Sequence, residues 1–154
     1  MLLALWQKLS RFPLGKCIFN ASLRWKVPYT GSICPEVLEM REGFVRVQMK
    51  DRRRVRNHLH SIHAIAMMNL GEASSGMAVL TALPENARAI ITHLEIDYFK
   101  KARGTLVATA DFKERFTQIT ENKDFEVEAS IKDSVNDEVA KVKARWRVGP
   151  NKRT

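Results

Sequence analysis

Residues 61–83 read SIHAIAMMNLGEASSGMAVLTAL, and apolar or small side chains occupy nearly every position of this stretch. A helix that is apolar almost all round is buried on most sides, so the pattern predicts a long central helix surrounded by the rest of the chain. Many of its residues are Gly, Ala or Ser, which let neighbouring segments approach closely. Asn69 and Glu72 stand out as polar residues within it.

Six segments on either side of this helix have the composition and alternation of β-strands. They are residues 36–40, 44–49, 87–99, 105–116, 125–131 and 139–148. Because short polar turns join the four segments after the helix, we expect these four to form an antiparallel meander. Two strands, a buried helix and four further strands predict an α+β fold in which a curved antiparallel sheet wraps around the central helix.

The N-terminal segment, residues 1–12, has apolar residues at helical spacing, and Pro13 is expected to end this short amphipathic helix. No basic region precedes the apolar run and no small-residue cleavage site follows it, so a signal peptide is not expected. Nor does any apolar run approach the roughly 18 residues that cross a bilayer. The helix is expected to dock onto the domain, with peripheral contact to anionic lipid as the alternative. The expected division of the chain is a helical extension (1–27), a main domain (28–148) and a basic tail (149–154).

The chain of 154 residues carries 26 Lys and Arg against 17 Asp and Glu, a formal net charge of +9. Its length suits one domain that buries a core without metal or disulfide. Cys17 and Cys34 are too few for a disulfide framework, so we expect reduced thiols and a cytoplasmic protein. The positive charge indicates an anionic partner. The candidates are nucleic acid, an acidic membrane surface and a phosphorylated ligand. Nucleic acid is not expected, because no nucleic-acid-binding motif and no aromatic residues interleaved with basic ones occur.

The stretch of residues 56–64, RNHLHSIHA, leads into the helix that carries Glu72. This arrangement resembles the phenylacetyl-CoA-type thioesterases of the hotdog fold, and it is closer still to a bacterial branch of hotdog proteins known mainly as a domain of unknown function. The resemblance covers roughly residues 28–148. Asn57, His63 and Glu72 fall where the family has its Asn, its His-Gly-Gly histidine and its helix acid. The resemblance implies a hotdog fold and an acyl-CoA thioester hydrolase that is a homodimer or a dimer of dimers.

Hydrolysis of a thioester needs a carboxylate that activates water or attacks directly, and donors that stabilise the oxyanion. Glu72 is the candidate carboxylate, because an apolar helix raises the pKa of an acid and makes it a better base near neutrality. The backbone N–H of Ala64 lies in the first helical turn, where amides lack intrahelical acceptors. It is the candidate oxyanion donor together with the Asn57 side chain, and His63 is expected to shape that turn.

His63 and Glu72 are nine residues apart, which corresponds to about 900° of helical rotation and about 13 Å of rise. Their side chains are therefore expected on opposite faces of the helix, and one chain does not easily bring both to one substrate. A two-fold dimer can place Asn57 and Ala64 of one subunit against Glu72 of the other. The family that the chain resembles builds its sites across a dimer in this way.

Two departures from the family pattern favour a second interpretation. Ala64-Ile65 stands where the family has Gly-Gly. Ile91 stands at the strand position where several thioesterases have Ser or Thr, and Thr92 beside it is expected on the other face. These departures favour a non-catalytic protein that binds acyl-CoA or fatty-acyl groups. A hotdog dehydratase or hydratase is a third alternative, although those enzymes typically space the His and the acid more widely.

Coenzyme A carries phosphates that Lys100, Lys101 and Arg103 are expected to bind, with the basic residues 52–54 as weaker candidates. Met68 is expected to line the acyl pocket, although methionine on a buried helix also fits plain core packing. Three His residues within 58–63 suggest zinc, but no Cys or carboxylate nearby has matching spacing, so no metal site is expected. Coenzyme A enters as part of the substrate, and no separate cofactor is expected.

Overall fold

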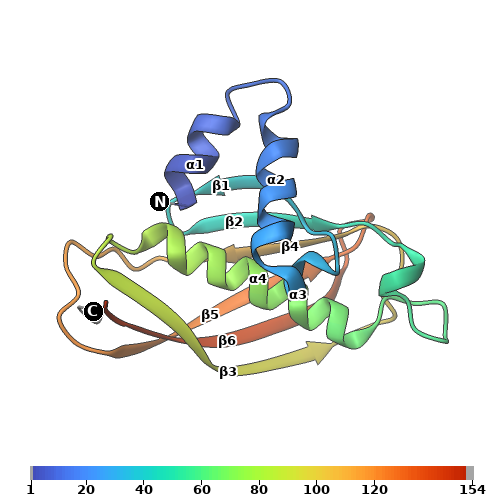
Figure 1. The fold of residues 1–154 in the computed structure, drawn as a ribbon. Helices are drawn as coiled ribbons and strands as arrows, with labels where there is room; N and C mark the ends of the chain where they lie inside the picture. Colours follow the sequence, from blue (N-terminus) through green and yellow to red (C-terminus); the bar gives the residue numbers. More distant parts are fainter. Residues whose placement is uncertain (1, 152–154) are drawn as a thin grey trace.

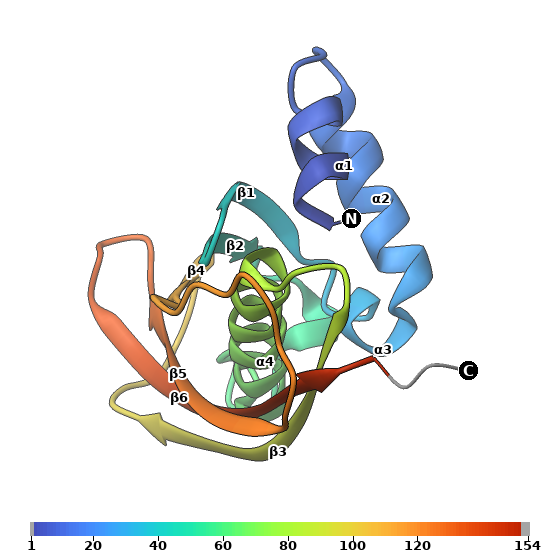
Figure 2. The same ribbon diagram turned by 90° about the vertical axis from the view of Figure 1, so that its left-hand side faces the viewer.

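The computed structural model describes residues 2–151, and residues 152–154 of the expected tail lie outside them, as does Met1. A six-stranded sheet curves around one long helix, α4 (Ala64–Ala82), which confirms the expected α+β architecture (Figure 1). Seen nearly along α4, the strands wrap around the helix (Figure 2). None of the described helices is long and apolar enough to cross a membrane.

The order of elements along the described chain alternates between helical and strand regions. The strands are β1 (Glu36–Arg41), β2 (Phe44–Met49), β3 (Ala87–Tyr98), β4 (Leu106–Asp111), β5 (Lys123–Lys132) and β6 (Glu138–Pro150). The helices besides α4 are α1 (Leu2–Leu9), α2 (Gly15–Lys26), α3 (Pro28–Gly31) and the short 3-10 helix η1 (Arg53–Val55).

The sheet order is β1-β2-β4-β5-β6-β3, and every neighbouring pair is antiparallel. The predicted four-stranded meander is therefore wrong for its first strand, because β3 pairs with β6 and β4 pairs with β2. Strand length explains the difference: β3 and β6 align 11 residue pairs, whereas all 6 residues of β4 match β2. The loop after β3 starts across the end of β6, where the Phe99 N–H donates to the Val139 carbonyl (2.9 Å).

Small residues allow α4 to lie close to β6. A Cβ atom at Gly71 would come within 2.3 Å of the Val142 side chain, and one at Gly76 would come within 2.7 Å of Trp146. The indole N–H of Trp146 donates to the hydroxyl of Ser75 on α4 (3.2 Å). The predicted burial of this helix is confirmed, since most of its residues are buried.

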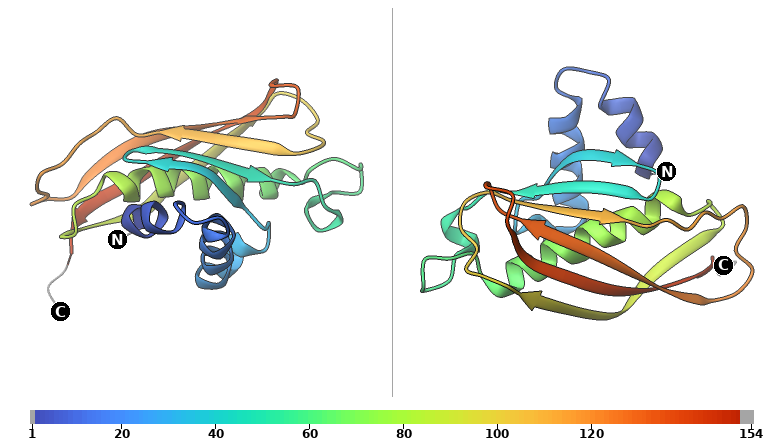
Figure 3. Two further views of the ribbon diagram at one scale, coloured as in Figure 1. Left: turned by 90° about the horizontal axis from the view of Figure 1, so that it is seen from above. Right: turned by 180° about the vertical axis from the view of Figure 1, so that it is seen from behind.

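The N-terminal segment contains a second helix, α2, after the short helix that the sequence predicted over residues 1–12. Phe19 of α2 packs edge to face against Trp6 of α1, with ring centroids 5.1 Å apart. We call α1 and α2 together the N-terminal hairpin. It lies on the side of α4 away from the sheet, so that α4 runs between the two (Figure 3).

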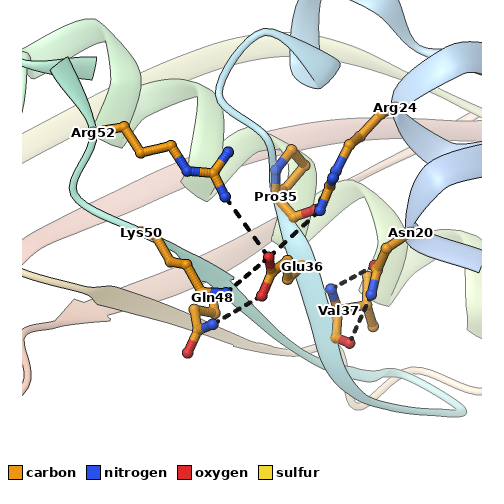
Figure 4. Close-up of polar contacts among 8 residues, drawn as sticks. All are labelled: Asn20, Arg24, Pro35, Glu36, Val37, Gln48, Lys50 and Arg52. Carbon is orange, nitrogen blue, oxygen red and sulfur yellow. Dashed lines mark hydrogen bonds and ion pairs between the residues drawn. The ribbon is translucent and has the colours of Figure 1, made fainter. Parts of the chain in front are cut away.

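The hairpin is fastened to β1, an edge strand of the sheet (Figure 4). The Asn20 side chain accepts from the Val37 N–H (2.8 Å) and donates to the Val37 carbonyl (3.5 Å). The Glu36 carboxylate lies within 3.2–3.8 Å of three cationic side chains, those of Arg24, Lys50 and Arg52. These contacts cover one edge of the sheet and protect it from pairing with another chain. The other edge strand, β3, pairs with β6 on one side and has no strand on its outer side among the described residues.

The strand predicted over residues 105–116 ends earlier, at Asp111. Past this point Phe112, Phe116 and Phe125 pack together, with ring centroids 5.4–6.1 Å apart. Aromatic and β-branched composition predicted a strand here, but the aromatic side chains of residues 112 and 116 pack as a cluster beside β5 instead of extending the ladder.

Candidate active site

Glu72 lies in the third turn of α4, on the side that the sheet leaves open. Its side chain is half-buried, and no described residue pairs with its carboxylate. Burial alone raises the pKa of the Glu72 carboxyl above its ordinary value. A carboxylate held in this way is a stronger base near neutrality than an exposed one, so Glu72 has the chemistry of a general base.

One hollow of about 590 Å³, here called the β3 hollow, lies between Glu72 and the edge strand. Met68 lines it beside Glu72, so the structure brings these two predicted residues together. Four consecutive residues of β3, Ile91 to Leu94, line its rim, where Ile91 is half-buried and Thr92 is exposed. A shift of register in β3 between Ile91 and His93 interrupts the strict alternation of side chains at this point.

Asn57 holds the loop that precedes α4. Its Oδ1 accepts three hydrogen bonds, from the Leu59 N–H (2.9 Å), the Ser61 N–H (3.2 Å) and the Ser61 hydroxyl (3.1 Å). Such side-chain-to-backbone bonds stabilise a tight turn. The Oδ1 atom of Asn57 is therefore occupied by hydrogen bonds within its own loop, whereas its Nδ2 group can donate to a ligand.

His63 and Ala64 form the start of α4. His63 is the N-cap residue, and its Nδ1 accepts from the Ile65 N–H (3.1 Å). Ala64 is the first helical residue, so its N–H has no intrahelical acceptor and points out of the positive end of the helix dipole. His63 therefore caps the helix through its side chain, and the Ala64 N–H lies at the helix N-terminus, where backbone donors can bind an anion.

No single hollow among the described residues is lined by both His63 and Glu72. His63 lines a second hollow of about 350 Å³ at the start of α4, together with Arg54 and Arg56. This helix-start hollow and the β3 hollow meet at three shared residues, which are Tyr29, Ile65 and Asn69. Within one chain, Glu72 and the start of α4 therefore line two different hollows, although these hollows adjoin each other.

The basic loop after β3 packs against the Asn57 turn. The Ile62 N–H donates to the Ala102 carbonyl (2.8 Å), and the Arg103 Nε donates to the His60 carbonyl (3.4 Å). The structure thus brings the predicted coenzyme A residues close to Asn57 and the start of α4, and away from Glu72.

The basic residues of that loop differ in whether an acidic side chain already pairs with them. Lys100 lies between Asp133 (3.2 Å) and Asp137, which raise the pKa of its ammonium group and balance its charge. Lys101 and Arg103 are exposed and form no ion pair with a described residue. The capacity for phosphate therefore resides mainly in Lys101 and Arg103.

Asn69 is a candidate functional residue to which the sequence alone assigned no role. It is only 7% exposed, yet its Oδ1 has no hydrogen-bond partner within residues 2–151, and its Nδ2 donates weakly to the Tyr29 carbonyl (3.4 Å). Buried polar atoms without a partner are costly and call for an explanation. The signal in the sequence was a polar residue three positions before Glu72 in an apolar helix, a spacing that places both on one face.

Comparisons with solved structures place this geometry in a class. A protein solved by structural genomics superposes with a TM-score of 0.81 at 27% identity, covering 97% of both chains. A Pseudomonas aeruginosa protein of unknown function, described as a probable thioesterase, gives a TM-score of 0.78 at 19% identity over 86% of this chain and 93% of its own. The PaaI protein of the E. coli phenylacetic acid degradation operon gives 0.68 at 20% identity over 88% and 95%. A search of curated proteins found no match.

These neighbours share the hotdog fold, and this confirms the fold that the resemblance implied. Within this class the model of the DUF4442 family, a domain of unknown function, matches residues 15–148. The chain belongs to the DUF4442 family.

Proposed function

We propose that the protein hydrolyses acyl-CoA thioesters and that Glu72 is the general base. The observation that carries this proposal is a half-buried carboxylate without a partner among the described residues, beside a hollow and with a raised pKa. Perturbed acids in clefts are characteristic of catalytic sites. The description of one structural neighbour as a probable thioesterase supports the same chemistry.

In the proposed reaction, Glu72 removes a proton from a water molecule as the water oxygen attacks the thioester carbonyl carbon. The negative charge on the carbonyl oxygen is stabilised by the Ala64 N–H and the Asn57 Nδ2 group. The carbon–sulfur bond then breaks, and the sulfur leaves as the thiol after taking up the proton from Glu72. The products are a carboxylic acid and free coenzyme A.

The proposed site lies across a homodimer, with Glu72 of one subunit facing Asn57 and Ala64 of the other. The separation of His63 and Glu72 into different hollows supports this arrangement. The edge strand β3 is 12 residues long and has an unpaired side, which suits pairing with the same strand of a second copy. A pair of such dimers is the larger assembly that the proposal allows.

Binding of the coenzyme A phosphates is assigned to Lys101 and Arg103, with Lys100 as a weaker contributor. Support comes from their exposure and from their position beside the Asn57 turn. Phosphate favours Arg and Lys because charge-assisted hydrogen bonds are strong.

Binding of acyl-CoA without turnover is the second candidate function. Ile65, 49% exposed at the start of α4, favours it because a branched side chain stands where the related enzymes have glycine beside the substrate. In that case the same hollows hold the ligand, but the thioester carbonyl stays out of reach of the Ala64 N–H.

A panel of acyl-CoA thioesters, assayed for release of free thiol, separates the two candidates. Hydrolysis of at least one thioester by the wild-type protein supports the enzyme. Binding of acyl-CoA in calorimetry without thiol release supports the second candidate. If no member of the panel is bound or hydrolysed, both candidate functions are contradicted.

A further inference from the structure

A third hollow lies on the other side of Glu72, between the N-terminal hairpin and α4. Its volume is about 410 Å³, within the range of about 300–1,000 Å³ typical of small-molecule sites. The lining is mainly apolar and comes from both parts of the molecule, including Leu5, Phe19 and Leu23 of the hairpin and Met77, Leu80 and Trp146 of the body. The only charged residues in the lining are Glu72 and Lys26. We call this space the hairpin hollow.

The hairpin hollow and the β3 hollow meet at Glu72. Glu72 and Thr30 line both spaces, whereas Ile91 and Met68 line only the β3 hollow. A molecule that occupied both would pass the carboxylate with an apolar end on one side and a more polar end on the other. An acyl thioester has this distribution of polarity, because a hydrocarbon chain is joined to a polar pantetheine arm at the carbonyl that the base must approach.

We propose that the hairpin hollow binds the unbranched acyl chain of the substrate, with the thioester at Glu72 and the pantetheine arm in the β3 hollow. This inference rests on the proposed function and specifies its substrate class. Taking about 30 Å³ for a group of the size of water, the hollow holds on the order of ten methylene groups. The substrates are therefore medium-chain acyl-CoA thioesters rather than acetyl-CoA.

The test compares rates along a series from butyryl-CoA to dodecanoyl-CoA. Each methylene that enters the hollow should raise kcat/KM about fourfold, which corresponds to about 0.8 kcal/mol, until the hollow is full. Ser22 lines the hollow from α2, and Ser22→Phe should fill it. The ratio of kcat/KM for dodecanoyl-CoA to that for butyryl-CoA should then fall at least tenfold. The matched control is Ser134→Phe, in the exposed turn between β5 and β6, which should keep the wild-type ratio.

A readout without turnover separates this inference from the proposed function. The probe is the thioether S-dodecyl-coenzyme A, whose binding is measured by calorimetry to wild-type protein and to both variants. Weaker binding by Ser22→Phe alone supports the hollow even if no thioester in the panel is hydrolysed. A chain-length profile and a thioether affinity that Ser22→Phe leaves unchanged would overturn the inference, whether or not hydrolysis occurs.

A separate observation concerns the outer face of α2. Leu14, Ile18 and Trp25 form an apolar stripe at helical spacing, opposite to the buried Phe19, and are 70%, 56% and 82% exposed. Residues 1–35, which include the whole hairpin, carry five basic and no acidic residues. The hairpin extends from the body of the molecule (Figure 1).

We infer that this face of the hairpin binds the surface of an anionic lipid bilayer. Lys8 and Arg11 are exposed and form no ion pair with a described residue, so their charges are available to lipid phosphates. Exposed Trp and Leu beside Lys and Arg are typical of helices that lie in a membrane interface. A second copy of the chain fits less well, because two such segments would bring only positive charges together.

Co-sedimentation with vesicles tests this second inference. Binding to phosphatidylcholine vesicles should strengthen at least tenfold when phosphatidylglycerol is included. Ile18→Ser with Trp25→Ser should weaken binding to the phosphatidylglycerol vesicles at least tenfold, whereas Val135→Ser, at an exposed apolar residue of a distant turn, should keep the wild-type binding. Equal binding to both kinds of vesicle would overturn the inference, and so would a stripe-dependent dimer in lipid-free solution.

Discussion

The outer face of the sheet and the open side of α4 both carry carboxylates, but those on the sheet are paired with arginine and the one on α4 is not. On the sheet, Asp124 receives two hydrogen bonds from Arg147 (2.7 and 2.9 Å), and this contact lowers the pKa of Asp124. Glu126 pairs with Arg145 on the neighbouring strand (2.8 Å). On α4, Glu72 has no described partner, and burial raises the pKa of its carboxyl.

This difference separates carboxylates that are paired in the fold from the one carboxylate to which we assign a reaction. Exposed pairs across strands contribute little, about 0–1 kcal/mol each. A broad trough of about 1,050 Å³ on the outer face is lined by side chains of both signs, among them Arg46, Glu128 and Lys141. An unpaired acid in an apolar setting costs stability, and proteins retain such groups mainly at functional sites.

The largest expected effect follows from removing the base. Glu72→Gln should lower the rate of thiol release on the order of a hundredfold or more, because it keeps the shape of the side chain but cannot accept the proton. The matched control is Glu126→Gln, which should stay within about twofold of wild type since Glu126 is an exposed, paired residue. Equal losses of thiol-release rate in the two variants would contradict the assignment of Glu72, but not Glu126, as a catalytic residue.

The next effect concerns the basic loop after β3. Lys101→Glu with Arg103→Glu should raise KM for acyl-CoA about tenfold at low salt, because charge-assisted contacts to phosphate are lost. The increase should shrink as salt is added. Arg145→Glu with Arg147→Glu makes the same change of charge on the outer face of the sheet and should leave KM unchanged. If both double variants raise KM alike, general attraction rather than a phosphate site is responsible.

A partial recovery of activity is expected from mixing two inactive variants. If the site is shared, a mixed dimer of Asn57→Ala and Glu72→Gln has one site with both substitutions and one with neither. Random exchange between equal amounts makes about half of the dimers mixed, so activity should recover to roughly a quarter of wild type. Exchange is confirmed by mass tags. Confirmed exchange without recovered activity would confine the site to one chain.

The smallest effect is on stability. The pKa of Glu72 is raised by folding, so its contribution to stability is fully present below the unfolded pKa and is lost as pH rises through the folded pKa. Glu72→Gln should therefore unfold at a higher temperature than wild type at neutral pH, by about 2–4 °C for a gain of about 1 kcal/mol. The difference should vanish in acid. A lower Tm at neutral pH would mean that the Glu72 carboxylate is stabilised by a partner.

The sequence predicted the central helix and the six strands because hydrophobic periodicity is a local signal. It did not predict that β3 pairs with β6, since pairing depends on which distant strand offers a ladder of matching length. It also missed α2, whose two apolar faces, with Phe19 inside and Trp25 outside, obscure the pattern of an ordinary surface helix.

The same limit applies to the candidate site. Glu72 could be singled out because it interrupts an apolar stretch, and Asn69 carried the same signal without an assigned role. The balance of the Lys100 charge could not be predicted, because Asp133 and Asp137 reach it from a turn more than 30 residues away. Contacts between distant segments decide which charged side chains are paired, and the spacing of residues along the chain does not predict these contacts.

The dependence of kcat/KM on pH tests the central claim most directly. For the best acyl-CoA substrate, wild-type protein should show a rate that rises with one ionisation, at a midpoint above the ordinary pKa of a glutamate. In Glu72→Gln that rise should disappear and leave a low, flat rate. A Glu72→Gln profile with the same midpoint and height as wild type would contradict the claim that Glu72 is the base.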